Sequence, residues 1–169
     1  GDLVHFSGPS GSGKSTAVDL LLGLRAHENG TICKRENLTF FYVSQHPFFP
    51  SCSISEYFKR ICPETTWEEI QSYLTELKLI FLAEDPDYYL GEAASNLSGG
   101  QRQLICLIVS VLLQPDVAIF DETTSGLDSQ SEDTFFKVVK SKLSNSAVIL
   151  ISHRNKSMKL ANQTLKFPA

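Results

Sequence analysis

The chain of 169 residues has no long apolar run and no block of basic residues. A membrane-spanning helix needs about 20 consecutive apolar residues, and the most apolar segment, residues 104–113, is much shorter and contains Ser110. The formal net charge is −4. Without a basic block there is little to displace the counterions of a nucleic acid, so the composition argues against a dedicated nucleic-acid-binding protein and no nucleic acid is expected as a partner.

Cysteine and methionine are rare in this sequence, and no leader sequence is recognisable. The four cysteines lie far apart in the sequence: Cys33, Cys52, Cys62 and Cys106. They form no C-x-x-C pair and have no histidine neighbours at zinc-ligand spacing, which favours reduced, mostly buried thiols over a metal site. The chain begins at Gly1 without a signal peptide, and Met158 is its only methionine. These features predict a segment of a longer protein.

Short apolar runs alternate with helical patterns at both ends of the chain. Strands are expected at about 3–7, 38–43, 117–120, 147–151 and 164–167, and helices at about 14–24, 99–113 and 129–143, with a short helix before the last strand. Between them, helices are expected at about 53–61 and 66–79. This alternation predicts an α/β domain with a mostly parallel sheet covered by helices on both faces. We expect one domain, 1–169, with a core at about 1–45 and 98–169 and an inserted helical subdomain at about 46–97.

Residues 8–15 read Gly-Pro-Ser-Gly-Ser-Gly-Lys-Ser and match the phosphate-loop pattern G-x-x-x-x-G-K-[ST], between an expected strand and an expected helix. Glycines allow backbone N–H groups to turn toward an anion, and the helix directs its positive end there. Lys14 at a helix start is unfavourable unless a polyphosphate neutralises it. The pattern predicts a nucleoside-triphosphate site with Ser15 on Mg²⁺. Its expected residues are Gly8, Pro9, Ser10, Gly11, Ser12, Gly13, Lys14, Ser15 and Thr16.

The expected strand at 117–120 is followed directly by two carboxylates, Asp121 and Glu122. Ligands of parallel α/β sheets bind beyond the carboxyl ends of the strands. We therefore expect Asp121 to hold Mg²⁺ through water and Glu122 to polarise a water molecule for attack on the γ-phosphate.

Residues 97–103, Leu-Ser-Gly-Gly-Gln-Arg-Gln, resemble the signature of the ATP-binding-cassette (ABC) ATPases. Further elements of that family follow in its order, and the resemblance covers the chain from Gly1 to about Phe167. The matching residues are Gln45, Ser98 to Gln101, Asp121 and Glu122, Ser125 to Asp128, and His153. The signature also has a local structural meaning, because Ser98-x-x-Gln101 matches the capping box that begins a helix.

The resemblance implies a P-loop NTPase (RecA-like) fold that binds and hydrolyses ATP with Mg²⁺. It implies that Glu122 is the general base, that His153 holds the γ-phosphate, and that Gln45 contacts Mg²⁺ and the attacking water. It also implies a second nucleotide-binding domain arranged head to tail. Residues that would act on the ATP of that partner are Ser98, Gly99, Gly100, Gln101 and Asp128.

The segment from Gln45 to Glu56 is similar to the exporter branch of the family. This similarity implies a transmembrane partner domain, on the same or a separate chain, and a location on the cytoplasmic side of a membrane. Phe48, Phe49 and Tyr57 are candidates for contact with that partner, or for a place in the core of the subdomain. The family usually has antiparallel strands and an adenine-stacking aromatic residue before the phosphate loop, and nothing precedes Gly1 in this sequence.

Two other functions are compatible with the motifs. One is a soluble ABC-type protein without a membrane partner, although such proteins usually carry basic insertions, paired cassettes or coiled coils, which this sequence lacks. The other is a regulatory cassette that binds ATP without hydrolysing it. The presence of Glu122, His153 and Ser98 counts against this second alternative.

Overall fold

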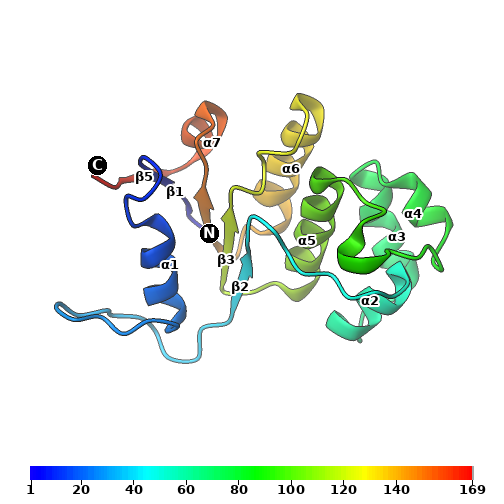
Figure 1. Ribbon diagram of the computed structural model, residues 1–169, viewed down its shortest axis with the longest axis horizontal. Coiled ribbons are helices and arrows are strands. Elements are labelled where there is room, and N and C mark those ends of the chain that lie inside the picture. The colour runs from blue at the N-terminus through cyan, green and yellow to red at the C-terminus, as the bar shows by residue number, and fades with distance from the viewer. Residues whose placement is uncertain (169) are drawn as a thin grey trace. The chain divides into compact units, whose positions relative to one another are not determined.

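The computed structural model describes residues 1–168, and its strands form one sheet (Figure 1). The sheet has the order β2-β3-β4-β1-β5, and all of its strand pairs are parallel. Its strands are β1 (Leu3–Ser7), β2 (Phe40–Val43), β3 (Val117–Asp121), β4 (Ala147–Ile151) and β5 (Gln163–Lys166). The predicted α/β fold with a parallel sheet is confirmed.

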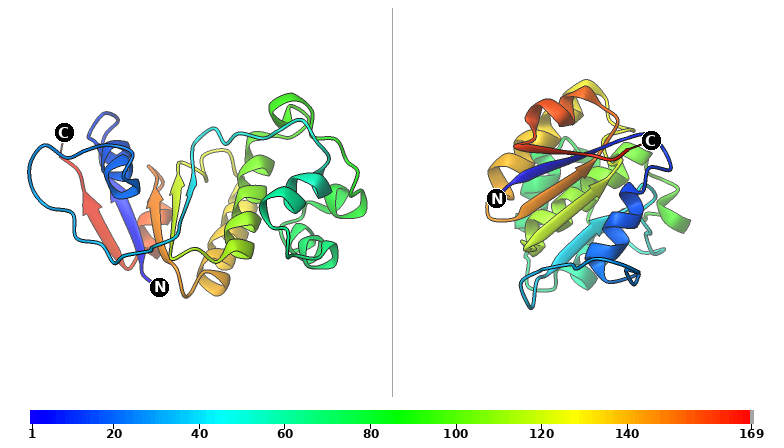
Figure 2. Two further views of the ribbon diagram at one scale, coloured as in Figure 1. Left: turned by 90° about the horizontal axis from the view of Figure 1, so that it is seen from below. Right: turned by 90° about the vertical axis from the view of Figure 1, so that its left-hand side faces the viewer.

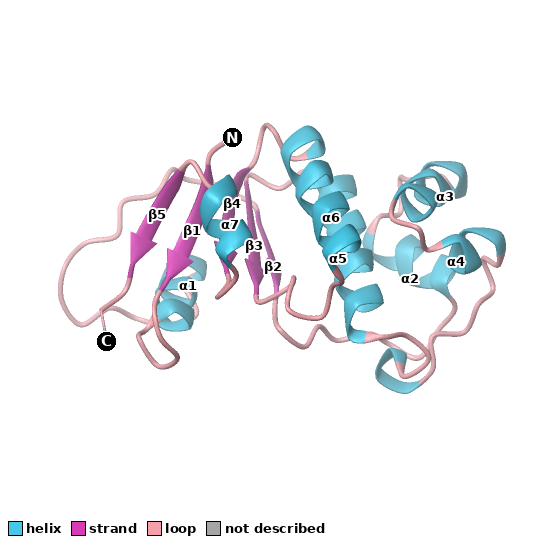
Figure 3. Ribbon diagram, turned by 90° about the horizontal axis from the view of Figure 1, so that it is seen from above, coloured by secondary structure: helices cyan, strands magenta, loops and turns pink. Residues whose placement is uncertain are grey.

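Helices cover both faces of this sheet. Helix α1 (Lys14–Leu22) lies on one face, and the short helix α7 (Asn155–Leu160) lies on the other (Figure 3). Side chains of successive strand residues point to opposite faces. Phe6, Ile119 and Ile151 therefore pack together with Val18 of α1 in one apolar cluster. Burial in the middle of the sheet explains why β3 and β4 are nearly uninterrupted apolar runs.

The described residues divide into two compact units. The first contains the sheet and consists of residues 1–45, 115–122 and 144–168, and the second contains the other helices and consists of residues 46–114 and 123–143. The helices of the second unit are α2 (Ile54–Ile61), α3 (Trp67–Glu76), α4 (Ile80–Glu84), the 3-10 turn η1 (Glu92–Ala94), α5 (Gly99–Leu113) and α6 (Ser129–Lys142). Helices α5 and α6 lie side by side (Figures 1 and 2). Both group with the helical unit, whereas the sequence places its boundary at about residue 97.

The expected helix at 66–79 is two helices in the structure. Thr66 caps α3, as its Thr-x-x-Glu pattern predicts, and its hydroxyl accepts a hydrogen bond from Glu69 N–H. The helix ends because Lys78 adopts a φ of +61°, outside the right-handed helical region. This turn leaves Leu77 and Leu79 buried on either side of an exposed Lys78. The packing of these two leucines explains the break between α3 and α4. No proline or glycine lies at this position, so the sequence contains no signal for it.

Aromatic and thiol side chains fill the interior of the helical unit. Phe49 and Tyr57 are 1% and 5% exposed and stack with ring centroids 4.9 Å apart. Three of the four cysteines are buried, as expected, and burial raises the pKa of Cys106 to about 12, which keeps it a neutral thiol. Among the described residues, no helix combines the length and apolarity that a membrane crossing requires.

A polar contact joins the starts of the neighbouring strands β2 and β3. The Asp116 carboxylate accepts hydrogen bonds from the Thr39 N–H at 2.9 Å, the Thr39 hydroxyl at 2.7 Å and Arg35 at 2.7 Å. The hydrogen bonds from Thr39, with a further contribution from Arg35, lower the pKa of Asp116. The contact thus stabilises the charged form of Asp116 at the edge of the sheet.

We expect Asp116→Asn to lower the free energy of unfolding by more at pH 7 than at pH 3. A carboxyl group whose pKa is depressed by folding stabilises the protein above its unfolded pKa of about 3.9, and this contribution disappears as the pH falls through the folded pKa. Urea unfolding at both pH values measures the difference. Asp87→Asn, at an exposed loop position, is the matched control, and equal losses from Asp116→Asn at both pH values would contradict the prediction.

Candidate functional site

The loop between β1 and α1 has the backbone geometry that its glycines allow. Gly11 and Gly13 have φ values of +81° and +93°, a region that other residues rarely adopt. Gly13 is also the N-cap of α1. Gly8 is required for a different reason, because a Cβ atom there would lie 2.9 Å from the backbone oxygen of Phe167. The loop therefore combines left-handed turns with close packing at the N-terminus of α1.

Lys14 is buried at the start of α1, with an exposed fraction of 8%. Its ammonium group donates to the carbonyl oxygens of Gly8 at 2.8 Å and Pro9 at 2.7 Å. No acidic residue lies in the first turn of α1. The ammonium group and the helix N-terminus together create a positive site that lacks a carboxylate from its own helix.

Asp121 ends β3 beside this loop, and Tyr42 of β2 donates a hydrogen bond to its carboxylate at 3.1 Å. Burial raises the pKa of Asp121, although the hydrogen bond from Tyr42 and the charge of Lys14 act in the opposite direction. Burial and the nearby carboxylate raise the pKa of Tyr42 to about 12, so its hydroxyl remains a donor. No sequence pattern identified Tyr42 as a site residue, because it contacts Asp121 across two strands that are 79 positions apart in the sequence.

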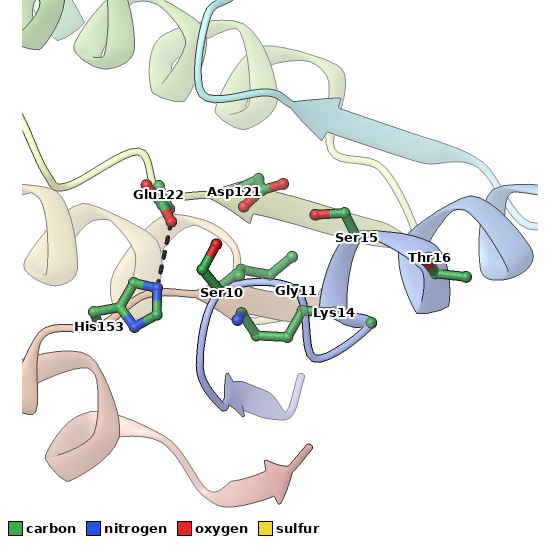
Figure 4. Close-up of a pocket in the computed structure, with 10 residues that line it drawn as sticks. Ser10, Gly11, Lys14, Ser15, Thr16, Asp121, Glu122 and His153 are labelled. Carbon is green, nitrogen blue, oxygen red and sulfur yellow. Dashed lines mark ion pairs between the residues drawn. The ribbon is translucent and has the colours of Figure 1, made fainter. Parts of the chain in front are cut away.

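The carboxylate of Glu122 is contacted by both other residues expected to take part in catalysis. Gln45 Nε2 donates to Glu122 Oε2 at 2.8 Å, and His153 Nε2 lies 3.5 Å from Glu122 Oε1 (Figure 4). Glu122 itself has a φ of +51°, and its N–H donates to the carbonyl of Ile151 at 2.8 Å. A left-handed backbone at a non-glycine residue is strained, and such strain is concentrated at functional sites.

Asp121, Glu122 and His153 line one cavity of about 190 Å³ together with residues of the loop and of the start of α1 (Figure 4). Its lining residues are Ser10, Gly11, Gly13, Lys14, Ser15, Thr16, Asp121, Glu122, Ile151 and His153. The cavity joins a cationic end, formed by Lys14 and the start of α1, to an acidic end formed by Asp121 and Glu122. It can accept an anion at one end and a hard cation at the other.

The oxygen donors of the cavity fit a magnesium ion. Ser15 offers a hydroxyl group, and Asp121 offers a carboxylate, which are the hard oxygen ligands that Mg²⁺ prefers. Within residues 1–168, no group of three or more His, Cys, Asp or Glu side chains forms a metal cage. This arrangement suits Mg²⁺, which usually binds through one or two protein ligands together with substrate phosphates and water.

The helical unit contains a second cavity, of about 200 Å³, at the N-terminus of α5. Ser98 caps this helix with the complete predicted capping box, in which its hydroxyl accepts from Gln101 N–H at 3.2 Å and Gln101 Oε1 accepts from Ser98 N–H at 2.8 Å. Ser98 is exposed, and Gly99 beside it adds no side chain. The helix start is therefore accessible on its outer side.

Asp128 lines the same cavity and is the N-cap of α6. Its carboxylate accepts from the N–H groups of Gln130 and Ser131 at 2.9 Å each, and the bonds from Ser131 and Gln130 lower its pKa. Gly100 and Gly126 bring the two segments together, since a Cβ atom at Gly100 would lie 2.8 Å from the Gly126 carbonyl oxygen. The structure thus groups Ser98, Gly100, Gln101 and Asp128 within one unit. Lys78, Leu77 and Leu79 also line this cavity, and no sequence signal identified them.

The aromatic residues proposed to contact a partner separate into two groups. Phe49 and Tyr57 are buried in the helical unit, so that of the two alternatives given for them the place in the core of the subdomain is confirmed. Phe48 is 83% exposed. These aromatic residues are close together in the sequence, and only the packing of the folded chain determines which of them are buried and which is exposed.

The parallel sheet and the glycine-rich loop before α1 define an α/β domain of the P-loop NTPase class. The family model for ABC transporters matches residues 1–125, and the chain belongs to this family. The match confirms the predicted ATP-binding-cassette class, whose members are ATPases.

Relatives include a zinc import protein and a member of ATP-binding cassette sub-family B. The chain is 33% identical to the zinc import ATP-binding protein ZnuC of Acinetobacter baylyi, over 90% of this chain and 57% of that protein. It is 31% identical to the mitochondrial ATP-binding cassette sub-family B member 10 of Mus musculus, over 96% of this chain and 25% of that protein. The chain thus spans less than two thirds of either relative.

A solved structure, a bacterial Atm1-family ABC exporter with ATP bound, has the same fold. The TM-score is 0.88 at 23% sequence identity, and the match covers 99% of this chain and 32% of that chain. At this level of identity the likeness concerns the fold alone.

Proposed function

We propose that this chain binds and hydrolyses ATP as the nucleotide-binding domain of an ABC membrane exporter, on the cytoplasmic side of the membrane. The observation that carries the proposal is that Gln45 and His153 both contact the Glu122 carboxylate. Glu122 and His153 line the same cavity as the phosphate loop. A binding-only cassette would not need this constellation.

In the proposed mechanism, ATP binds with its phosphates against the loop from Gly8 to Ser15. Lys14 exchanges its bonds to the loop carbonyls for bonds to phosphate oxygens, so that its charge is neutralised without distortion of the loop. Mg²⁺ would be held by Ser15, by Gln45 and, through water, by Asp121, and would neutralise charge on the phosphates. Tyr42 orients the Asp121 carboxylate.

Glu122 orients the attacking water and accepts its proton. Gln45 fixes the carboxylate from one side, and its amide group is of the kind that can also bond to the attacking water. His153 is 54% exposed and can turn from Glu122 toward the γ-phosphate, where it donates to the oxygens that gain charge. Most of the rate enhancement then comes from positioning and electrostatic stabilisation.

The second cavity supports a two-chain active site. Ser98, Gly99, Gly100 and Gln101 at the start of α5, with Asp128 nearby, would contact the ATP held by a second nucleotide-binding domain. An exposed, capped helix start without an acidic first turn suits the γ-phosphate of a partner. We propose a head-to-tail dimer that forms around two ATP molecules.

The exporter assignment rests on the segment after Gln45 and on relatives of sub-family B. Exposed Phe48 is the candidate contact with a transmembrane domain. An importer is the second candidate, because the chain is also similar to zinc import proteins. The full-length coding sequence tests the choice: several apolar spans of about 20 residues on the same polypeptide support an exporter.

We expect Lys14→Ala to weaken Mg-ATP binding roughly 10- to 100-fold, as loss of a charge-assisted hydrogen bond costs about 1.5–3 kcal/mol. The fold should remain intact, because within residues 1–168 the Lys14 ammonium group bonds to two carbonyl oxygens and a serine of its own loop. Isothermal titration calorimetry measures the affinity, and circular dichroism measures the fold. Lys59→Ala, at an exposed position of α2, is the control. Unchanged affinity in a folded Lys14→Ala protein would place the phosphate site elsewhere.

A further inference from the structure

A buried histidine lies in the middle of β1. His5 is 1% exposed and interrupts a strand whose neighbours Val4 and Phe6 face the apolar cluster under α1. By the alternation of side chains, His5 faces the opposite side of the sheet, where α7 lies against β1 (Figure 3). A buried strand of a parallel sheet normally carries apolar side chains at such positions.

The ring of His5 makes one hydrogen bond in the described part of the chain. Its Nε2 lies 2.8 Å from the carbonyl oxygen of Ser152. A carbonyl only accepts, so Nε2 is the donor in this hydrogen bond. Nδ1 is buried and has no hydrogen-bond partner among residues 1–168. This arrangement costs free energy that an apolar side chain would avoid, which points to a role for the Nε2 bond.

Ser152 is the first residue beyond β4 and directly precedes His153. In the register of β1 and β4, His5 lies opposite Leu150, so that Ser152 is two residues further along on the same face. The backbone pairing of the two strands ends at Phe6 and Ile151. The side chain of His5 therefore supplies a donor to a carbonyl beyond the end of the ladder.

Two further hydrogen bonds hold the backbone on either side of His153. Glu122 N–H donates to the carbonyl of Ile151 at 2.8 Å, and the Ser152 hydroxyl accepts from Arg154 N–H at 3.0 Å. Together with the bond from His5, these contacts hold residues 151–154 through hydrogen bonds from the end of β3, from β1 and within the turn itself. The side chain of His153, by contrast, is half exposed, and its polar contact among the described residues is the long one of 3.5 Å with Glu122. Its position depends on its backbone.

We propose that His5 is a positioning residue, which holds the Ser152 carbonyl and thereby aims His153 at the γ-phosphate. This inference rests on the proposed function of the Glu122 and His153 site. His5 does not touch the reacting atoms and acts through the backbone that precedes His153. Because phosphate binding depends on the loop from Gly8 to Ser15, His5 should affect turnover much more than ATP affinity.

The test compares three variants at position 5. His5→Gln retains an N–H donor at about the reach of Nε2, His5→Asn has a donor that is too short, and His5→Leu has none. We expect His5→Leu and His5→Asn to lower kcat roughly 10-fold or more, as small misplacements of reacting groups do. His5→Gln should restore kcat to within about threefold, and the Kd for ATP should stay within about twofold in all variants, since ground-state binding is separate from the transition-state contact.

Two readouts separate positioning from general damage. In a His153→Ala background, His5→Leu should cause no further loss of kcat, because residues that act as a unit are not additive. Nuclear magnetic resonance of the His153 ring should show the same chemical shifts in wild type and His5→Gln and altered shifts in His5→Leu or His5→Asn. If His5→Leu does not fold, His5→Asn and His5→Gln decide the matter.

The inference is overturned if folded His5→Leu keeps the wild-type kcat, or if His5→Gln and His5→Asn lower kcat equally. It is also overturned if His5→Leu lowers kcat further in the His153→Ala background. Failure of the proposed function is distinguishable, because the wild-type protein would then not hydrolyse ATP at all. In that case the His153 ring shifts still test whether His5 fixes its position.

Discussion

Replacement of Glu122 by glutamine is expected to leave Mg-ATP bound and to lower kcat by roughly 10²- to 10⁴-fold, the usual contribution of a general base. Glutamine has nearly the same shape, so the contact with Gln45 and the bond from Glu122 N–H to Ile151 can both remain. What is lost is the ability to accept a proton from water. Phosphate release assays at saturating ATP, combined with calorimetry of ATP binding, measure the two effects separately.

Glu84→Gln is the matched control for this experiment, because Glu84 is exposed at the end of α4. It should hydrolyse ATP at the wild-type rate. A Glu122→Gln protein that hydrolyses ATP within severalfold of wild type would refute the assignment of Glu122 as the base. The role would then move to His153 or Gln45, the two residues that contact its carboxylate.

Ser98→Arg is expected to abolish the ATP-dependent dimer and ATP hydrolysis while sparing ATP binding to the phosphate loop. The arginine side chain would occupy the accessible start of α5, where we place the γ-phosphate of the partner. The natural protein should be a monomer without nucleotide and should form a dimer when ATP is trapped, as in Glu122→Gln. Analytical ultracentrifugation of Glu122→Gln with and without Ser98→Arg, in Mg-ATP, measures this assembly.

Ser98→Arg also removes a capping side chain, which costs about 1 kcal/mol of stability. Circular dichroism must therefore show a folded variant, and bound ATP must be measured in the same samples. Ser72→Arg, at an exposed position of α3, adds the same side chain away from the cavity and should still form the dimer. A dimer that survives Ser98→Arg, or full ATPase activity from a strict monomer, would refute the two-chain active site.

Several features of the fold and of the site could be predicted from the sequence alone, because they depend on residues that are close together in it. The glycines of residues 8–13 predict left-handed turns at a helix start, and Gly11 and Gly13 adopt them. Ser98-x-x-Gln101 predicts a capping box, which is present in full. The apolar strand that ends at Asp121 places its carboxylates beyond the edge of a parallel sheet. Each of these features involves residues close together in the sequence, so that spacing and side-chain type suffice to predict it.

Tertiary structure alone decided the contacts between distant segments. Gln45 and Glu122 are 77 positions apart and meet because β2 and β3 pair in parallel, and the same pairing brings Tyr42 to Asp121. Packing also separates Phe48 on the surface from its buried neighbour Phe49. His5 reaches Ser152 only because β1 and β4 are adjacent. Such contacts depend on strand order and register, which are set by the burial of the whole sheet and leave no signal in any short segment.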